Sequence, residues 1–327
     1  MSFRQSEFRV VAAGLEYPEG PVYQSDGSVV LVEIHKGTLT RVGPDGAKQT
    51  IANLGGGPNG AAVGPDGALY VCNDGGLAWM EIPATKTTLP VLVPLGQPPN
   101  YTGGLIQRVT GNTFTTLYSQ CNGNRLCSPD DLVFDATGNF WFTDWGKQRA
   151  TDRDITGVYY AQPDGTKIVQ AIPQRSAPNG IALSPDDSRL YVAETYARWI
   201  LYWELAAPGV IKPNPNTLDG SYLLTADIPG QGTLDSMAVD EEGNVYAATM
   251  LPRGPNSAIP GGITVISPKG KILDFIELMV EGKPEPLPSN LCFGGPDRRT
   301  AFITLAGTGR LVACEMKLPG KPLHFGG

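Results

Sequence analysis

The chain has 327 residues, of which 41% are hydrophobic and 17% charged, with a formal net charge of -7 and a pI near 5.0. This length admits two domains, but all-β barrels and propellers of this size often form one, and the hydrophobic content suffices for a large core. The acidic balance argues against nucleic acid or an anionic membrane surface as a partner.

The start of the chain and its cysteines indicate a protein of a reducing compartment. Residues 1–7 lack the apolar core of a signal peptide, and no apolar run approaches the roughly 20 residues of a membrane span. The five cysteines are odd in number and form no Cys-x-x-Cys pair. We therefore expect mostly buried thiols, with Cys121 and Cys127 unbridged although close in sequence. The expected protein is cytoplasmic, as a monomer or small homo-oligomer.

Taken in chain order, one short motif recurs from end to end. A polar turn, a strand, a Pro-Asp-Gly-like turn and a second strand return at intervals of roughly 40 to 70 residues, as expected for propeller blades with loops. The first copy begins at Leu15-Glu16-Tyr17-Pro18-Glu19-Gly20-Pro21. The six copies carry an acid or amide at the turn: Glu19, Asn59, Asp130, Asn179, Asp235 and Asn290.

The repeats predict an all-β six-bladed β-propeller that spans residues 1–327 as a single domain. The 41 Gly and 29 Pro residues, without a collagen-like period, fit turns between many short strands. Turns such as Pro44-Asp45-Gly46 suit antiparallel strand pairs, and no stretch has sustained helical periodicity. Radial closure would hide the sheet edges. We expect the N-terminal strand, residues 8–12, to close the ring against the last blade.

Two long segments interrupt the repeat. Residues 77–105 are apolar and rich in proline, and a second loop rich in Pro and Gly covers residues 251–262. Long loops in compact domains are usually functional or disordered. Because the first segment is so apolar, with Trp79, Met80 and Tyr101 among its residues, we expect it to form a packed, lid-like insertion.

The turn residues form the candidate functional site. Symmetry places all six at one end of the central channel, pointing inward, where three carboxylates would repel one another unless a cation lay among them. Their oxygen atoms suit one divalent metal, Ca²⁺ first, with Zn²⁺, Mn²⁺ and Mg²⁺ as alternatives. A single Asx residue is usually only a turn former. Six at equivalent positions, one of them a Glu with no turn role, favour a metal site.

Several motifs carry a resemblance to a known family. Glu19-Gly20-Pro21, Pro178-Asn179-Gly180 and Leu234-Asp235-Ser236 resemble the senescence marker protein/regucalcin/gluconolactonase family, which includes the diisopropylfluorophosphatases. The run from Arg125 to Leu132 is similar to the bacterial gluconolactonase pattern, with Cys127 and Asp130 where Asn usually stands. The resemblance covers essentially the whole chain.

The resemblance implies a metal-dependent hydrolase that opens a small-molecule lactone. It implies Glu19, Asn179 and Asp235 as metal ligands, with Asp130 in place of a third-blade Asn. Asp130 could tighten metal binding, stay protonated or act as a base. Asp235, or as second choice Asp130, would take the proton from the attacking water. Candidate substrate-contacting residues are Arg125, Asn59, Asp131, Trp145 and Tyr101.

Other functions remain open from the sequence. The same metal could hydrolyse a phosphotriester or fluorophosphate, or the propeller could bind a metal without catalysis. A Ser-His-Asp triad is not expected, because the chain has only His35 and His324 and no Gly-x-Ser-x-Gly elbow. We expect structural or surface roles for both histidines. The size of the insertion favours a hydrophobic or aromatic lactone.

Overall fold

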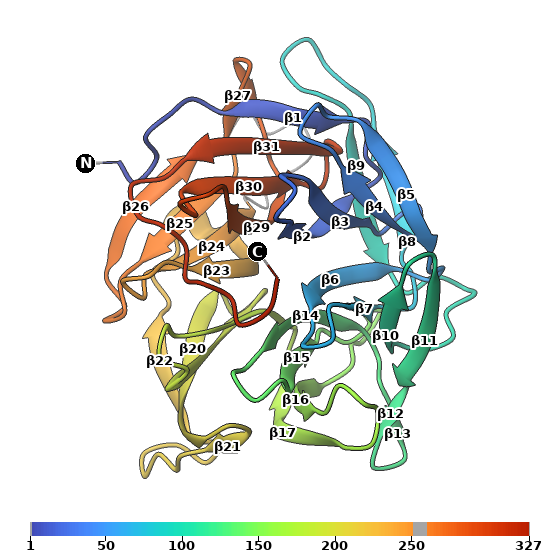
Figure 1. Cartoon of the computed structure of the whole chain (residues 1–327), viewed down its shortest axis with the longest axis vertical. Helices are drawn as coiled ribbons and strands as arrows, with labels where there is room; N and C mark the ends of the chain where they lie inside the picture. The colour runs from blue at the N-terminus through green and yellow to red at the C-terminus, as the bar shows by residue number, and fades with distance from the viewer. Residues whose placement is uncertain (1, 251–259, 327) are drawn as a thin grey trace.

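The computed structural model describes residues 2–250 and 260–326 and shows six antiparallel sheets arranged around a central axis (Figure 1). The described residues contain no α-helix and one 3-10 helix, η1 (Pro229–Gln231). The prediction of an all-β six-bladed propeller is therefore confirmed. Residues 251–259, most of the second long loop predicted from the sequence, lie outside the described residues.

The first three blades follow chain order from the axis outward. Blade 1 contains β2 (Pro18–Tyr23), β3 (Val29–Glu33), β4 (Thr38–Val42) and β5 (Lys48–Asn53). Blade 2 contains β6 (Pro58–Val63), β7 (Leu69–Asn73), β10 (Leu105–Thr110) and β11 (Thr113–Tyr118). Blade 3 contains β14 (Pro129–Phe134), β15 (Phe140–Asp144), β16 (Thr156–Ala161) and β17 (Ile168–Arg175).

The remaining blades keep this order until the last strand. Blade 4 contains β18 (Pro178–Leu183), β19 (Arg189–Glu194), β20 (Trp199–Ala207) and β22 (Ser221–Thr225), with the short β21 (Val210–Ile211) also paired to β20. Blade 5 contains β23 (Thr233–Val239), β24 (Val245–Met250), β25 (Gly262–Ile266) and β26 (Ile272–Glu277). Blade 6 contains β29 (Pro288–Gly294), β30 (Thr300–Leu305), β31 (Arg310–Glu315) and, from the N-terminus, β1 (Arg9–Ala13).

The two ends of the chain meet in one sheet. β1 pairs antiparallel with β31, with Val10 opposite Val312, so the first strand forms the outer edge of the last blade. This confirms the predicted closure. Because the ring is closed by backbone hydrogen bonds between distant segments, no blade can leave the ring without breaking a neighbour's packing.

The hydrophobic core lies between blades rather than on the axis. Between blades 3 and 4, for example, Trp141, Val192 and Trp203 are fully buried in one cluster. A similar cluster joins blades 5 and 6. Alternation along each strand places apolar side chains against the neighbouring blade, as in other stacked sheets. At the start of the inner strands, the axis is thus left for polar side chains.

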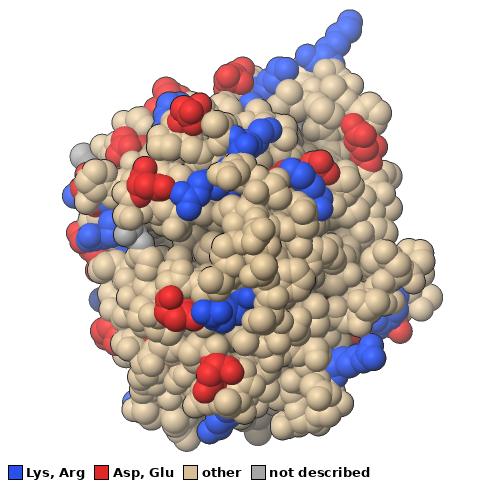
Figure 2. All heavy atoms as spheres, turned by 45° about the vertical axis from the view of Figure 1, so that its right-hand side comes forward, with Lys and Arg blue, Asp and Glu red and all other residues tan. Residues whose placement is uncertain are grey.

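Each inner strand runs from one face of the ring to the other, which separates two sets of loops. The inner strands start at the face that carries the predicted site residues, here called the ring face. Connections from the second to the third strand of a blade return to this face, and the Pro-Asp-Gly-like turns lie on the opposite, far face. On the side shown in Figure 2, charged side chains of both signs are scattered among uncharged residues.

The insertion at 77–105 is folded and packed. It forms a hairpin of β8 (Ala78–Ile82) and β9 (Val91–Gly96). Leu92 N donates to Gly307 O in the connection between β30 and β31, and Gln97 N donates to Gln148 O beside blade 3. The hairpin therefore reaches from blade 6 to blade 3 on the ring face. Two smaller hairpins join β12 (Gln120–Cys121) to β13 (Asn124–Arg125) and β27 (Met279–Val280) to β28 (Lys283–Pro284).

The sequence also led us to expect unbridged cysteines and no membrane-spanning segment. All five cysteines are free thiols, so Cys121 and Cys127 are not bridged. Within residues 2–250 and 260–326, no helix has the length and apolar character needed to cross a membrane.

Candidate functional site

The six turn residues lie at the second or third position of the six inner strands, β2, β6, β14, β18, β23 and β29. Neighbouring inner strands contact one another around the whole ring. Hydrogen bonds link side chains of different blades: Asn290 Nδ2 donates to Glu19 Oε2 at 2.8 Å, and Asn59 Nδ2 donates to Asp130 Oδ2 at 3.1 Å. The structure thus brings together residues that lie up to 271 positions apart in the chain. We call them the axial ring.

A β-bulge in every inner strand turns these side chains toward the axis. In β14, Pro129 pairs with Asp144 and Leu132 with Phe142, so three steps on one strand oppose two on the other. The inner strands of the other five blades also contain one extra residue at this point. A bulge bends the strand and re-aims a side chain. Repeated six times, it presents the polar residues of the axial ring inward.

Two glycines allow the bulges of adjacent blades to approach closely. A Cβ on Gly60 would lie 2.5 Å from Asp130 O, and a Cβ on Gly180 would lie 2.7 Å from Asp235 O. Real Cβ atoms do not come this close to backbone atoms, so each position needs a residue without a side chain. The Asn-Gly pairs at Asn59 and Asn179 therefore serve ring closure as well as the polar site.

The acids of the axial ring are held in a setting that opposes their ionisation. Glu19 and Asp130 are 2% and 5% exposed. Burial, and then the carboxylate of Asp235, raises the pKa of both well above the usual range. Burial also raises the pKa of Asp235 to about 7. Asp235 is the most exposed of the three, being only half-buried.

Two oxygen atoms of the axial ring lack any hydrogen-bond partner among the described residues. These are Glu19 Oε1 and Asp130 Oδ1, both cut off from solvent. Buried carboxylate oxygens normally have a partner, and a cation is one that suits them. Among the described residues, no three His, Cys, Asp or Glu side chains lie close enough together to hold a metal by themselves. An ion here would therefore also need amide oxygens, such as that of Asn179.

Thr195 sets the orientation of the Asn179 amide. Its Oγ1 accepts a 3.3 Å hydrogen bond from Asn179 Nδ2 and a 3.1 Å bond from Trp145 Nε1. These bonds fix the Nδ2 end of the Asn179 amide. The other end, Oδ1, has only a long contact of 3.5 Å with Ser236 Oγ. Asn179 Oδ1 is thus left as an acceptor in the axial ring. The Thr195 hydroxyl links the Asn179 amide to the indole of Trp145.

Three other residues predicted to contact the substrate, Arg125, Tyr101 and Asp131, do not lie together. Arg125 is exposed on the ring face and donates to Thr102 O, while the half-buried Tyr101 donates its hydroxyl to Cys127 O. Asp131 points to the other side of the axial ring: its carboxylate accepts from Leu132 N, and it lines a chamber described below. Burial raises the pKa of Asp131 to about 7.

Sequence reasoning missed Tyr17, which lies two residues before Glu19. Tyr17 is 7% exposed, its backbone φ is 59°, and its ring packs 4.8 Å from that of Trp79 in the insertion. Burial, then the carboxylates of Asp235, Glu19 and Asp130, raises the pKa of Tyr17. The phenol therefore lies beside the acids of the axial ring. Its position before a glutamate turn was the only signal in the sequence.

The two histidines lie outside the axial ring. His35 Nδ1 lies 2.7 Å from Glu16 Oε2 and its ring meets the edge of Trp79. His324 Nε2 lies 2.6 Å from Asp187 Oδ2 on the far face. These contacts agree with the structural or surface roles expected from the sequence.

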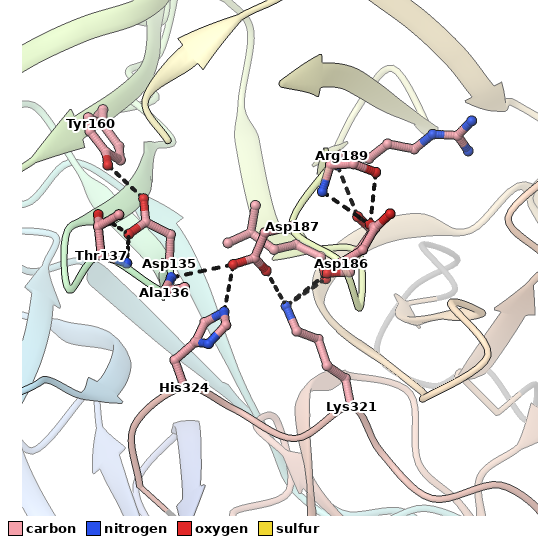
Figure 3. Close-up of polar contacts among 12 residues, drawn as sticks. Asp135, Ala136, Thr137, Tyr160, Asp186, Asp187, Arg189, Lys321 and His324 are labelled. Atoms are coloured by element: carbon pink, nitrogen blue, oxygen red, sulfur yellow. Dashed lines mark hydrogen bonds and ion pairs between the residues drawn. The ribbon is translucent and has the colours of Figure 1, made fainter. Parts of the chain in front are cut away.

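A chamber of about 570 Å³ lies below the axial ring, toward the far face. It is lined largely by apolar residues of the inner strands, together with Asp131 and with Asn290 of the axial ring. The C-terminal segment, residues 321–326, forms part of its wall, and the C-terminus lies near the centre of the ring in Figure 1. Figure 3 shows Lys321 and His324 both bound to Asp187, which anchors this segment. None of the aromatic residues Tyr17, Trp79 and Trp145 of the ring face is among the residues that line the chamber.

Known proteins resemble this chain over most of its length. The chain is 28% identical over 318 residues to a gluconolactonase of Zymomonas mobilis, covering 90% of this chain and 78% of that protein. It is 30% identical over 299 residues to the lactonase drp35 of Staphylococcus aureus, covering 90% and 77%.

Solved structures share the fold at lower identity. A gluconolactonase from Xanthomonas campestris superposes with a TM-score of 0.70 at 21% identity, covering 97% of this chain and 92% of that one. The calcium-binding protein regucalcin from Agrobacterium tumefaciens superposes with a TM-score of 0.67 at 16% identity, covering 95% and 94%. The family model for the SMP-30/gluconolactonase/LRE-like region matches residues 17–307, and this chain therefore belongs to that family.

Proposed function

We propose that this protein is a metal-dependent lactonase whose reaction takes place at the axial ring. The observation that carries the proposal is the pair of buried carboxylate oxygens, Glu19 Oε1 and Asp130 Oδ1, that have no partner among the described residues. They face an axis where a third acid, Asp235, raises the pKa of both groups. Relatives named gluconolactonase and lactonase support the choice of reaction.

Glu19, Asn179, Asp235 and Asp130 would hold the ion. Their donor set is all oxygen, which Ca²⁺ accepts with the loosest geometry and Mg²⁺, Mn²⁺ or Zn²⁺ accept with tighter demands. When bound, the ion would polarise the lactone carbonyl and supply positive charge beside the developing oxyanion. The amides of Asn290 and Asn59 hold Glu19 and Asp130 in place for this role.

Asp235 is the proposed general base. It is more exposed than Glu19 and Asp130, so water can reach its carboxylate. Asp235 would take a proton from the water that attacks the carbonyl carbon. The ring C–O bond then breaks, and the proton passes to the leaving ring oxygen to give the open hydroxy acid. Asp130, whose Oδ2 already accepts from Asn59, is the second choice.

The walls of the ring face support an apolar or aromatic substrate. The insertion places Trp79 against Tyr17, and Trp145 lies one hydroxyl from Asn179. With Tyr101 on the same face, these side chains offer more aromatic surface than a small polyol needs. We expect alkyl or aryl lactones to be turned over faster than gluconolactone. Equal or slower turnover would contradict this preference.

The test measures hydrolysis of a mixed panel of lactones, with the acid released recorded by pH-stat. The protein is treated with a chelator, and Ca²⁺, Mg²⁺, Mn²⁺ and Zn²⁺ are then added back one at a time. We expect activity to vanish with the chelator and to return with one ion, which names it. Absence of hydrolysis of any lactone under all conditions would overturn the proposal, and parallel assays with phosphotriesters and fluorophosphates would test the alternative chemistry.

A further inference from the structure

Arg153, at the edge of the ring face, forms no ion pair with an acid in the part of the chain that the structure describes. It lies in the connection between β15 and β16, which leaves the ring end of β15 after Asp144. Its Nη2 donates to Trp145 O at 2.6 Å, whereas its Nε and Nη1 are cut off from solvent and have no hydrogen-bond partner among the described residues. Two donors of a charged group are thus unused, which is costly unless an acceptor completes them.

Two aromatic rings hold the guanidinium in place. Its central carbon lies 4.4 Å from the ring centre of Trp145 and 5.1 Å from that of Tyr196. Cation–π contacts of this kind orient the guanidinium without satisfying its hydrogen bonds. Tyr196 is half-exposed, so its ring lies at the surface of the protein and not in the core. Its hydroxyl donates to Gln148 Oε1 at 3.1 Å, and a ligand that displaced this ring would reach the guanidinium.

The acids next to Arg153 in the chain are already committed. Asp154 accepts from Arg149 at 2.7 Å and from Lys147 N, and Asp152 accepts from Arg149 at 2.5 Å. Their carboxylates accordingly raise the pKa of Arg149, whereas burial lowers the pKa of Arg153. Arg149 thus engages both carboxylates of this loop, and among the described residues no acidic side chain forms an ion pair with Arg153.

The stack is connected to the axial ring by two hydrogen bonds. Trp145 Nε1 and Asn179 Nδ2 both donate to Thr195 Oγ1. Tyr196 is the next residue along the chain. A substrate whose carbonyl lies at the axial ring would therefore extend over Trp145 toward Arg153.

We infer that Arg153 binds a carboxylate carried by the substrate, so that the preferred lactone is one with an acidic substituent. This inference rests on the proposed lactonase function and names its substrate class. A carboxylate matches a guanidinium in charge and hydrogen bonding better than a neutral hydroxyl does. The aromatic residues would pack against the uncharged part of the same molecule.

The test compares binding and hydrolysis with matched pairs of molecules. Pyroglutamate and pyroglutamamide are five-membered lactams that differ only in their substituent, which is a carboxylate in the first and an amide in the second. They serve as stable analogues of the lactone substrates in calorimetry with Ca²⁺ present. The corresponding γ-lactone carboxylate and carboxamide serve as substrates. We expect the carboxylate member to bind at least 10-fold more tightly and to have a lower KM.

Three variants connect this preference to Arg153. Arg153→Met should remove the preference mainly through KM, and Arg153→Lys should restore part of it. Arg108→Met is the matched control, because Arg108 pairs with Asp66 at a Pro-Asp-Gly turn of the far face, and should leave the preference unchanged. Circular dichroism checks that each variant is folded.

The possible outcomes separate this inference from the proposed function. Equal binding of pyroglutamate and pyroglutamamide by the unmodified protein would overturn it, even if neutral lactones are hydrolysed. A preference that survives in folded Arg153→Met would also overturn it, since the carboxylate would then bind elsewhere. Carboxylate-selective binding that depends on Arg153, without hydrolysis of any lactone, would support the binding role of Arg153 and reject the lactonase function.

Discussion

Asn290 and Glu19 join the last blade to the first at the axis through a 2.8 Å hydrogen bond from Nδ2 to Oε2. Glu19 Oε2 also accepts from Gly20 N, whereas Oε1 has no partner among the described residues. The amide therefore fixes one oxygen of a buried carboxylate and leaves the other for the axis. This pairing links closure of the propeller to the geometry of its candidate metal site.

Asn290→Ala is expected to weaken metal binding. A hydrogen bond to a charged group contributes about 1.5–3 kcal/mol, so the affinity for the ion should fall by about 10-fold or more. Calorimetric titration of the metal-free protein measures this. The matched control is Asn244→Ala, which removes a buried amide bound to Asp240 Oδ2 at 2.7 Å next to a far-face turn. An equal loss of affinity in both variants would contradict the role of Asn290.

Asp235→Asn and Asp130→Asn should differ in activity. Loss of the general base typically costs about 10²–10⁴ in kcat, which we expect for Asp235→Asn. Asp130→Asn keeps an oxygen acceptor at its position, and we expect kcat to fall by less than about 10-fold. Steady-state kinetics with metal content measured in parallel decides between them. A larger loss in Asp130→Asn would make Asp130 the base.

Metal affinity should rise with pH through about 7. In the metal-free protein, burial raises the pKa of Asp235 to about 7, and burial also raises the pKa of Glu19 and of Asp130. Below this pH protons compete with the ion, so binding should release protons and be weaker. Above it Asp235 is already ionised, and its share of the released protons disappears. Calorimetry at about pH 6, 7 and 8, in buffers that differ in ionisation enthalpy, measures the number of protons released on metal binding.

Lys147→Met should destabilise the fold and its insertion. Lys147 is fully buried, donates to Gly76 O at 2.8 Å and lies 3.3 Å from Asp74 Oδ1, at the base of the insertion. Removal of one partner of a buried ion pair costs about 3–5 kcal/mol, because the other charge stays buried. Urea unfolding measures the loss.

A surface ion pair supplies the control for Lys147. Lys212 pairs with Glu204 at 3.0 Å and is well exposed, so Lys212→Met should change the free energy of unfolding by less than about 1 kcal/mol. Equal stability of the two lysine variants would show that the Lys147–Asp74 contact does not hold the insertion.

The sequence by itself determined the number of blades and the positions of the axial residues. Both depend on local signals: a turn residue before each inner strand and Pro-Asp-Gly turns between strands, repeated at intervals that a propeller allows. The closure by the N-terminal strand also followed, because a ring of six blades needs its ends paired. Such patterns depend on spacing along the chain, which the sequence contains in full.

The tertiary structure alone decided how these residues are oriented and what surrounds them. The register of β14 against β15 creates the bulge that separates Asp130, on the axial ring, from Asp131, on the chamber side, although the two are adjacent in sequence. Thr195 meets both Asn179 and Trp145, and Arg153 meets Tyr196, only after blades 3 and 4 pack together. Contacts of this kind join residues far apart in the chain, so no local pattern encodes them.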